Sequence, residues 1–222
     1  MKYFLLGVLV AIALEATAQN QFIGIKGGVN HTNVNFRDLD AQPNFRTGVS
    51  AGMTYEYLLT DRFSLGVDLI YNQRGYTEDI ILTDWNGNML IHDLIRYNID
   101  YASIPIKVGF NTGNKLYAFT NVGLIPSFLV SATLVEPRFT SQWGQVRTTG
   151  TDRHNITSEL ANFDLAGFAE LGAGYKYMNN YWLFTSFSYQ TSFNSFANPK
   201  HHQGNRITHY GMTLSVGMKY LH

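Results

Sequence analysis

The sequence contains no cysteine. Disulfide bonds, thiolate zinc sites and a cysteine nucleophile are therefore excluded. Charged residues are also scarce, at 14% of the 222 residues, against about 25% in a typical soluble domain. Basic and acidic residues balance, so the formal net charge is zero. A neutral chain has no overall field that would attract nucleic acid, and we expect no nucleic-acid partner.

Long apolar runs are missing beyond the N-terminus. Residues 1–18 combine Lys2, an apolar core from Tyr3 to Leu14 and the small-residue end Ala16-Thr17-Ala18. That pattern predicts a signal peptide cleaved near Ala18, with one domain over residues 19–222; a buried N-terminal helix is the alternative. No later run approaches the ~20 apolar residues of a membrane helix. If the exported chain crosses a membrane, it does so as strands.

The feature that the sequence does have is strict alternation, clearest in residues 163–177, FDLAGFAELGAGYKY. Its odd positions are apolar or aromatic, and its even positions are mostly small or charged. A two-residue period predicts a β-strand with two different faces. The segment is about twice as long as an average soluble strand. Long strands with aromatic ends suit a transmembrane barrel, which needs about 9–11 residues per crossing.

The same reading extends to the whole chain and predicts eight strands. They cover residues 21–33, 45–58, 62–76, a segment ending near 110, 115–132, 163–177, 181–193 and 207–221. The fifth has the least clear alternation, and we expect Pro126 to break its ladder. The connections alternate between long and short, with all short turns at one end. This order predicts an all-β, eight-stranded antiparallel up-and-down transmembrane β-barrel.

Two of the long connections have different expected structures. Residues 77–98 contain Asn86-Gly87, a strong hairpin signal, so the flanking strands are expected to extend past the membrane and meet there. Residues 133–162 are polar, and we expect them to be irregular. With an even number of strands, both termini should be periplasmic. The loops around Trp85, Trp143 and His201 should then face outwards.

The polar face of the predicted strands carries charges of both signs. An eight-stranded barrel has an interior only wide enough for side chains to fill, and an unpaired buried charge is costly. We therefore predict a lumen charge network in which each charge lies beside an opposite one on a neighbouring strand. Its members are Lys26, Arg46, Glu56, Asp68, Arg74, Asp100, Lys107, Asp164, Glu170, Lys176 and Lys219. The alternative is a lipocalin-like barrel with an apolar interior and a solvated polar face.

Few residues suggest chemistry. Ser192 and His209 lie on neighbouring predicted strands and form the one candidate nucleophile–base pair, but no third orienting group is evident. His201 and His202 are adjacent in a loop without a nearby carboxylate, which is a poor metal site. Asp164 and Glu170 are more consistent with a structural network than with acid–base catalysis. We predict no catalytic residue, no metal and no cofactor.

Several short segments resemble the PorT-like family of outer-membrane β-barrels. They are Gly24-Ile25-Lys26-Gly27-Gly28-Val29-Asn30, Tyr101-Ala102-Ser103-Ile104-Pro105-Ile106-Lys107, Phe163-Asp164 with Gly172-Ala173-Gly174-Tyr175, and the glycine-alternating final strand. The resemblance covers the mature chain and implies a bacterial outer-membrane location. It implies outer-membrane lipids and the barrel-insertion machinery as partners. The family's namesake is associated with protein secretion, which adds other envelope or secretion proteins as a further class of partner.

Three functions are compatible with such a barrel. The first is a non-enzymatic structural, adhesive or assembly component that acts through its external loops. The second is a membrane-embedded lipid hydrolase or acyl-transferase. The third is a small porin-like channel, which a lumen packed with side chains disfavours.

Overall fold

The computed structural model describes residues 21–37, 42–142, 145–178, 180–197 and 206–222, so the predicted signal peptide lies outside the described residues. The strands are β1 Gln21–Phe36, β2 Asn44–Leu58, β3 Phe63–Thr83, β4 Met89–Ser103, β5 Ile106–Gly113, β6 Leu116–Gln142, β7 Gln145–Asn155, β8 Phe163–Tyr177, β9 Tyr181–Ser192 and β10 Ile207–Leu221. One short 3-10 helix, η1 Thr157–Glu159, precedes β8. Within the described residues, no helix is long and apolar enough to cross a membrane.

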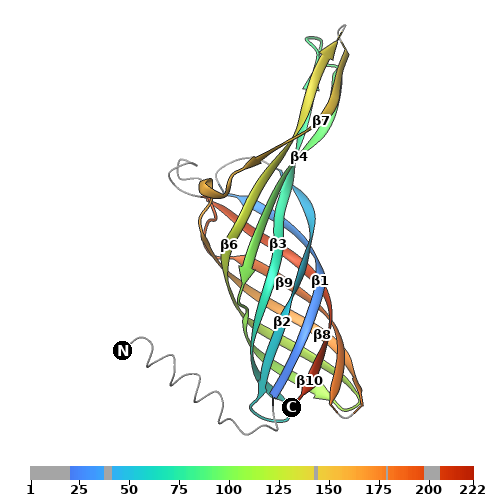
Figure 1. Cartoon of the computed structure of the whole chain (residues 1–222), viewed down its shortest axis with the longest axis vertical. Coiled ribbons are helices and arrows are strands. Elements are labelled where there is room, and N and C mark those ends of the chain that lie inside the picture. The colour runs from blue at the N-terminus through green and yellow to red at the C-terminus, as the bar shows by residue number, and fades with distance from the viewer. Residues whose placement is uncertain (1–20, 38–41, 143–144, 179, 198–205) are drawn as a thin grey trace, which may run out of the picture.

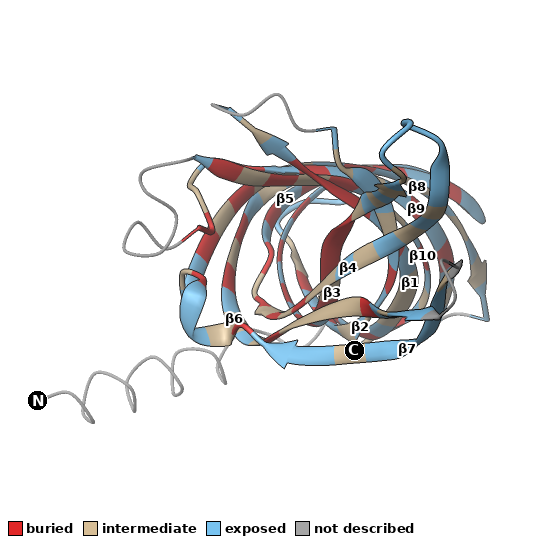
Figure 2. Cartoon of the chain, turned by 90° about the horizontal axis from the view of Figure 1, so that it is seen from above, coloured by how far each residue is buried: buried red, intermediate tan, exposed pale blue. Residues whose placement is uncertain are grey.

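The strands close into a barrel (Figures 1 and 2). β1 pairs with β2 and β10, and antiparallel pairing continues through β3, the β4 and β5 pair, β6, β8 and β9 back to β10. β4 and β5 are two halves of one crossing, separated only by Ile104 and Pro105. The predicted eight-stranded antiparallel barrel is therefore confirmed. Closure leaves no free edge in the barrel wall.

The expectation that Pro126 interrupts its strand is wrong, because β6 runs through it. The Ile104 N–H donates to the Pro126 carbonyl oxygen at 2.8 Å. In an antiparallel ladder the N–H and C=O of one residue point to the same neighbouring strand. The missing N–H of Pro126 therefore faces the gap between β4 and β5, where Pro105 already interrupts the ladder.

The outer wall of the barrel is apolar. Ile25, Met53, Leu69, Leu171 and Val216 have exposed fractions of 58–64%. Exposed aromatic side chains stand nearer the strand ends: Phe45, Phe63, Phe163, Tyr177, Tyr181, Phe193 and Tyr220. An apolar band flanked by aromatic residues is the surface that a transmembrane barrel presents to lipid. Charged side chains are instead buried inside, so the lipocalin-like alternative is wrong.

The connections sort as predicted. Those between β2 and β3, β5 and β6, and β8 and β9 are short and lie at one end of the barrel, here called the turn end. At the other end, β3 with β4 and β6 with β7 continue past the rim as two projecting hairpins (Figure 1). We call these hairpins the blade, residues 77–96, 133–142 and 145–155, and this end the blade end. The register runs from Thr77↔Arg96 to Thr83↔Met89 in the first hairpin and from Thr133↔Asn155 to Gln142↔Gln145 in the second.

The hairpin predicted at Asn86-Gly87 is confirmed, since the Gly87 N–H donates to the Asp84 carbonyl at 3.0 Å. The irregular structure expected for residues 133–162 is wrong over most of that range, because the end of β6 pairs with β7. Many residues there are polar on both faces of the sheet. A strand wetted on both sides shows no apolar alternation, although its threonine and valine content suits a strand.

The blade leaves the barrel wall at Gly75. This residue has φ of 146°, and a Cβ atom at that position would lie 1.9 Å from the carbonyl oxygen of Tyr97. Both observations require glycine here. The Thr32 hydroxyl donates to the Gly75 carbonyl at 2.9 Å and fixes the bend from inside.

The predicted orientation of the barrel can be tested with single cysteines, because the natural chain has none. We expect Asn86→Cys, at the tip of the blade, to react with a membrane-impermeant maleimide on intact cells. Asn114→Cys, at the turn end, should react only after the outer membrane is opened, because short turns of such barrels face the periplasm. Labelling of Asn114→Cys but not Asn86→Cys on intact cells would reverse the orientation.

Candidate functional site: a sealed lumen and its outer rim

The turn end of the lumen is filled by an aromatic cluster, Phe22, Tyr117, Phe119, Trp182 and Phe184. Ring centroids lie 4.6 Å apart for Phe22 and Trp182, and 4.7 Å apart for Tyr117 and Trp182. Sequence reasoning missed this cluster. The unclear alternation of the fifth predicted strand was its signal, because Tyr117 and Phe119 place aromatic side chains on the face otherwise occupied by small and charged residues.

Next to the aromatic cluster lies an ion-pair network of four buried side chains, Glu56, Asp68, Lys107 and Lys219, and one partly buried side chain, Lys26. Glu56 bridges Lys219 at 2.6 Å and Lys107 at 2.8 Å. Asp68 bridges Lys26 at 2.6 Å and Lys107 at 3.0 Å. The five residues come from β1, β2, β3, β5 and β10, so the network ties opposite parts of the wall together.

Glu170 completes the charge balance of this region without forming an ion pair among the described residues. Its carboxylate accepts hydrogen bonds from the Asn121 amide at 2.6 Å and the Ser186 hydroxyl at 2.8 Å. The network contains three lysines and two carboxylates, and Glu170 lies within electrostatic reach of Lys26 and Lys107. Its negative charge offsets the third lysine at longer range.

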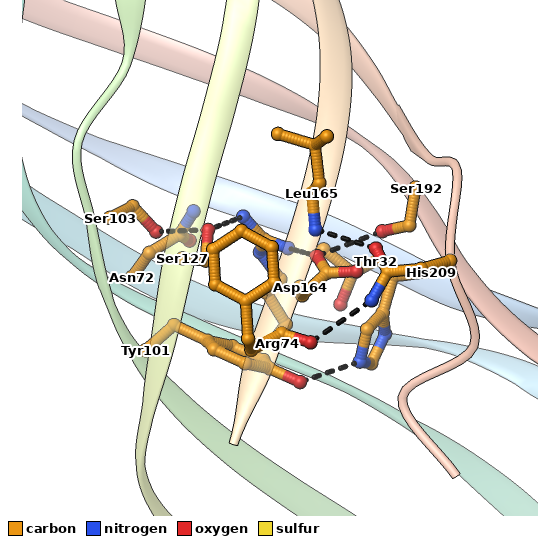
Figure 3. Close-up of polar contacts among 12 residues, drawn as sticks. Thr32, Asn72, Arg74, Tyr101, Ser103, Ser127, Asp164, Leu165, Ser192 and His209 are labelled. Carbon is orange, nitrogen blue, oxygen red and sulfur yellow. Dashed lines mark hydrogen bonds and ion pairs between the residues drawn. The ribbon is translucent and has the colours of Figure 1, made fainter. Parts of the chain in front are cut away.

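Between the two ends of the lumen lies a polar cavity of about 40 Å³, whose lining includes Asn30, Asn72, Glu170 and Gln190. That volume accommodates a few ordered waters, at about 10–15 Å³ each. Nearer the blade end, Arg74 pairs with Asp164 at 2.7 Å, and both side chains are fully buried. Arg74 also donates to the Ser127 hydroxyl at 3.1 Å and lies over the Tyr101 ring (Figure 3). These layers seal the lumen.

The candidate nucleophile–base pair is not formed. Ser192 donates to the Asp164 carboxylate oxygen that also accepts from Arg74, at 2.9 Å (Figure 3). His209 is buried, stacks on Phe196 with centroids 4.0 Å apart, and its Nε2 lies 3.4 Å from the Tyr101 hydroxyl. Asp164 is held by Arg74 rather than by a histidine. These contacts pack the side chains of the lumen together and do not form a catalytic pair. The other two candidate histidines, His201 and His202, lie outside the described residues.

Seven of the eleven residues predicted for the lumen form ion pairs with one another: Lys26, Glu56, Asp68, Arg74, Lys107, Asp164 and Lys219. The others differ from the prediction that each charge has an opposite partner. Glu170 has neutral partners, and Lys176 lies 4.0 Å from the Trp182 ring centroid. Half-buried Arg46 donates to the Arg74 carbonyl at 2.9 Å.

The placement of Asp100 inside the lumen is wrong. Its neighbours in β4, Ile99 and Tyr101, are both fully buried. Successive side chains of a strand point to opposite faces, so Asp100 points out of the barrel. It accepts a hydrogen bond from the Ser131 hydroxyl on β6 at 3.1 Å.

The blade end of the lumen is covered by an apolar cap that the sequence reading did not foresee. Its buried core includes Ile99, Ile156, Leu160, Phe196 and Ile207. The chain after β7 and the chain after β9 meet here, through a bridge between Leu160 and Ala197. Ile156 and Leu160 lie in the segment that was expected to be irregular and polar, and their wide spacing gives no periodic signal.

Comparison with known proteins gives a family. The model of the outer membrane protein beta-barrel domain matches residues 17–198. No curated protein matches the sequence. Similar solved structures include Neisserial surface protein A, with TM-score 0.49 and 12% identity over 90% of this chain and 97% of that one. OprG from Pseudomonas aeruginosa gives TM-score 0.46 and 11% identity over 91% and 96%.

The outer membrane protease OmpT from Escherichia coli is similar as well, with TM-score 0.40 and 9% identity over 92% of this chain and 94% of that one. The matched family model spans most of the sequence, and the sealed barrel has the apolar outer wall that the family's location requires. The chain belongs to the family of the outer membrane protein beta-barrel domain.

Proposed function

We propose that this outer-membrane barrel is a non-enzymatic binding protein that attaches to other protein surfaces through its blade. The observation that carries the proposal is the tip of the first blade hairpin. Trp85 is completely exposed, and Ile81, Met89 and Leu90 beside it are 55%, 63% and 41% exposed. Large apolar side chains gathered on a surface that projects into water mark an interaction site.

The blade has the order needed to present that tip. Asp84 fixes the turn: its carboxylate accepts hydrogen bonds from the backbone N–H of Asn86 at 2.9 Å and of Asn88 at 2.8 Å. The side-chain amide of Asn88 also donates to this carboxylate, at 2.9 Å. The hydrogen bonds lower the pKa of Asp84, and the one from the Asn88 side chain contributes most. The two hairpins also contact each other, since the Thr148 hydroxyl donates to Asp93 at 2.9 Å.

The lumen supports this proposal over the two alternatives. A channel would need a continuous water path, whereas buried ion pairs and aromatic rings fill both ends of the lumen. A lipid hydrolase or acyl-transferase would need an activated nucleophile, whereas Ser192 is engaged with Asp164. The finer resemblance to the PorT-like group rests on the sequence motifs alone, and it adds envelope or secretion proteins to the surfaces that the blade would contact.

The test is attachment of a Gram-negative host that displays the protein. Cells with the natural chain should bind to a protein-coated surface several times more than cells without it. The double variant Trp85→Ser, Met89→Ser should lose this gain. A matched control, Thr140→Ser on the second hairpin, should keep it.

Surface labelling of each variant must show equal display. Equal attachment of the tip variant and the natural chain would contradict the proposal. Ion conductance through planar bilayers that contain the natural chain would favour the channel instead.

A further inference from the structure

We propose that the apolar cap contains a binding site for a small, uncharged, apolar molecule of about the size of benzene. The site is a cavity of about 140 Å³ at the blade end. Its lining is Tyr76, Tyr97, Ile99, Leu134, Ile156, Glu159, Leu160, Phe196 and Ile207. This site is separate from the tip of the blade and does not depend on the function proposed for it.

The walls of the cavity come from parts of the chain that are far apart in sequence. β3 and β4 contribute a pair of stacked tyrosines, Tyr76 and Tyr97, with centroids 4.2 Å apart. Ile156 and Leu160 flank η1 on either side, and Phe196 comes from the chain after β9. Phe196 is held in turn by stacking on His209. The lining is therefore anchored to the barrel rather than carried by one loop.

The size of the cavity selects the ligand. Apolar cavities of about 150 Å³ lined by aliphatic and aromatic side chains stay free of water and bind benzene. A cavity of this kind is more than a packing defect of a single methyl group, and an empty one reduces stability in proportion to its volume. A molecule of one aromatic ring fills it, whereas only part of a long acyl chain would fit within 140 Å³.

The charge of the described lining disfavours anionic ligands. Among the nine described residues that line the cavity, Glu159 is the only charged one, and it is exposed. The Tyr97 hydroxyl points to a second carboxylate, Glu78, at 3.4 Å. A carboxylate or phosphate would meet acidic groups, with no basic side chain among the described lining residues to compensate it. A neutral molecule meets no such penalty.

The experiment uses the full chain refolded in lipid nanodiscs, with isoleucine δ1 methyl groups labelled for NMR and fluorobenzene as the probe. Fluorobenzene also dissolves in lipid, so the comparison is between two sets of methyl groups. Ile99, Ile156 and Ile207 line the cavity, whereas Ile25 and Ile106 face the lipid. We expect saturable shifts in the first set and only small, linear shifts in the second.

Leu160→Phe fills the cavity and should weaken binding at least tenfold. Leu171→Phe, which adds a ring on the lipid face, is the matched control and should bind as the natural chain does. If Leu160→Phe fails to fold, Ile156→Phe serves the same purpose. Linear shifts at Ile99, Ile156 and Ile207, or saturation that persists in a folded cavity-filling variant, would overturn the proposal.

Discussion

Replacing Glu56 by glutamine is expected to lower the free energy of unfolding by about 3–5 kcal/mol, the cost of leaving a buried charge without its partner. In the part of the chain that the structure describes, Glu56 is the only carboxylate in ion-pair contact with Lys219, which is buried at the turn end. Lys107 would keep Asp68, but Lys219 would be left facing the aromatic rings of Phe119 and Phe184. Glutamine preserves the shape of the side chain, so the loss reports on charge rather than on packing.

The measurement is urea unfolding in lipid vesicles, followed by the fluorescence of Trp182 beside the network. A second variant, Glu56→Gln with Lys219→Met, should recover part of the loss, because removing both charges removes the unpaired one. The control is Asp152→Asn, which breaks the exposed ion pair with Arg138 on the blade and should change stability little. A neutral result for Glu56→Gln would mean that water reaches the network.

Leu171→Arg is expected to cost about 2–4 kcal/mol and to reduce membrane insertion, because a charge on the lipid face is destabilising near the bilayer midplane. Leu171 lies in the middle of β8, paired with Thr120 and Phe187, and is 64% exposed on the outer wall. Leu171→Ile should insert normally. The fraction of inserted barrel can be read from its heat-modifiable electrophoretic mobility.

Glu170, the residue next to Leu171, faces the lumen, so its substitution by an apolar residue should be destabilising. Glu170→Leu should cost about 1–3 kcal/mol, because the Asn121 and Ser186 donors lose a buried acceptor. This is less than the about 3–5 kcal/mol of a broken buried ion pair, because no cation among the described residues forms an ion pair with Glu170. Damage from Leu171→Ile together with tolerance of Leu171→Arg would contradict a lipid-facing outer wall.

The barrel itself could be predicted because the strands of its wall have one face toward the packed, polar lumen and the other face toward lipid. Most strands of the wall therefore alternate in sequence, as β8 does, whereas β6 alternates less clearly. The blade could not be predicted in full, because residues 138–141 and 146–155 are mostly exposed to water on both faces. The pattern of one-sided burial that reveals a strand is missing there, and only the turn at Asn86-Gly87 is encoded locally.

The lumen was predicted in composition but less well in its contacts. The alternation within each strand correctly indicated that Arg74 and Asp164 both face the lumen. Only the closed barrel brings them together, because they are 90 positions apart in the sequence. The inward aromatics of β6 were missed because Tyr117 and Phe119 look the same whether they face lipid or the lumen. The cap was missed because Ile156, Leu160 and Phe196 belong to segments in which apolar residues do not recur at a regular spacing.

The bridge between Glu56 and Lys219 has a consequence for assembly. The two residues are 163 positions apart and join β2, near the start of the chain, to the end of β10. Contacts of such long sequence separation form late, because the intervening chain must first be ordered. Until the last strand docks on the first, three lysines and their carboxylates stay hydrated in an open sheet. The charge network therefore forms only when the barrel closes, and it then stabilises the closed barrel. A chain truncated before Lys219 should remain an open sheet.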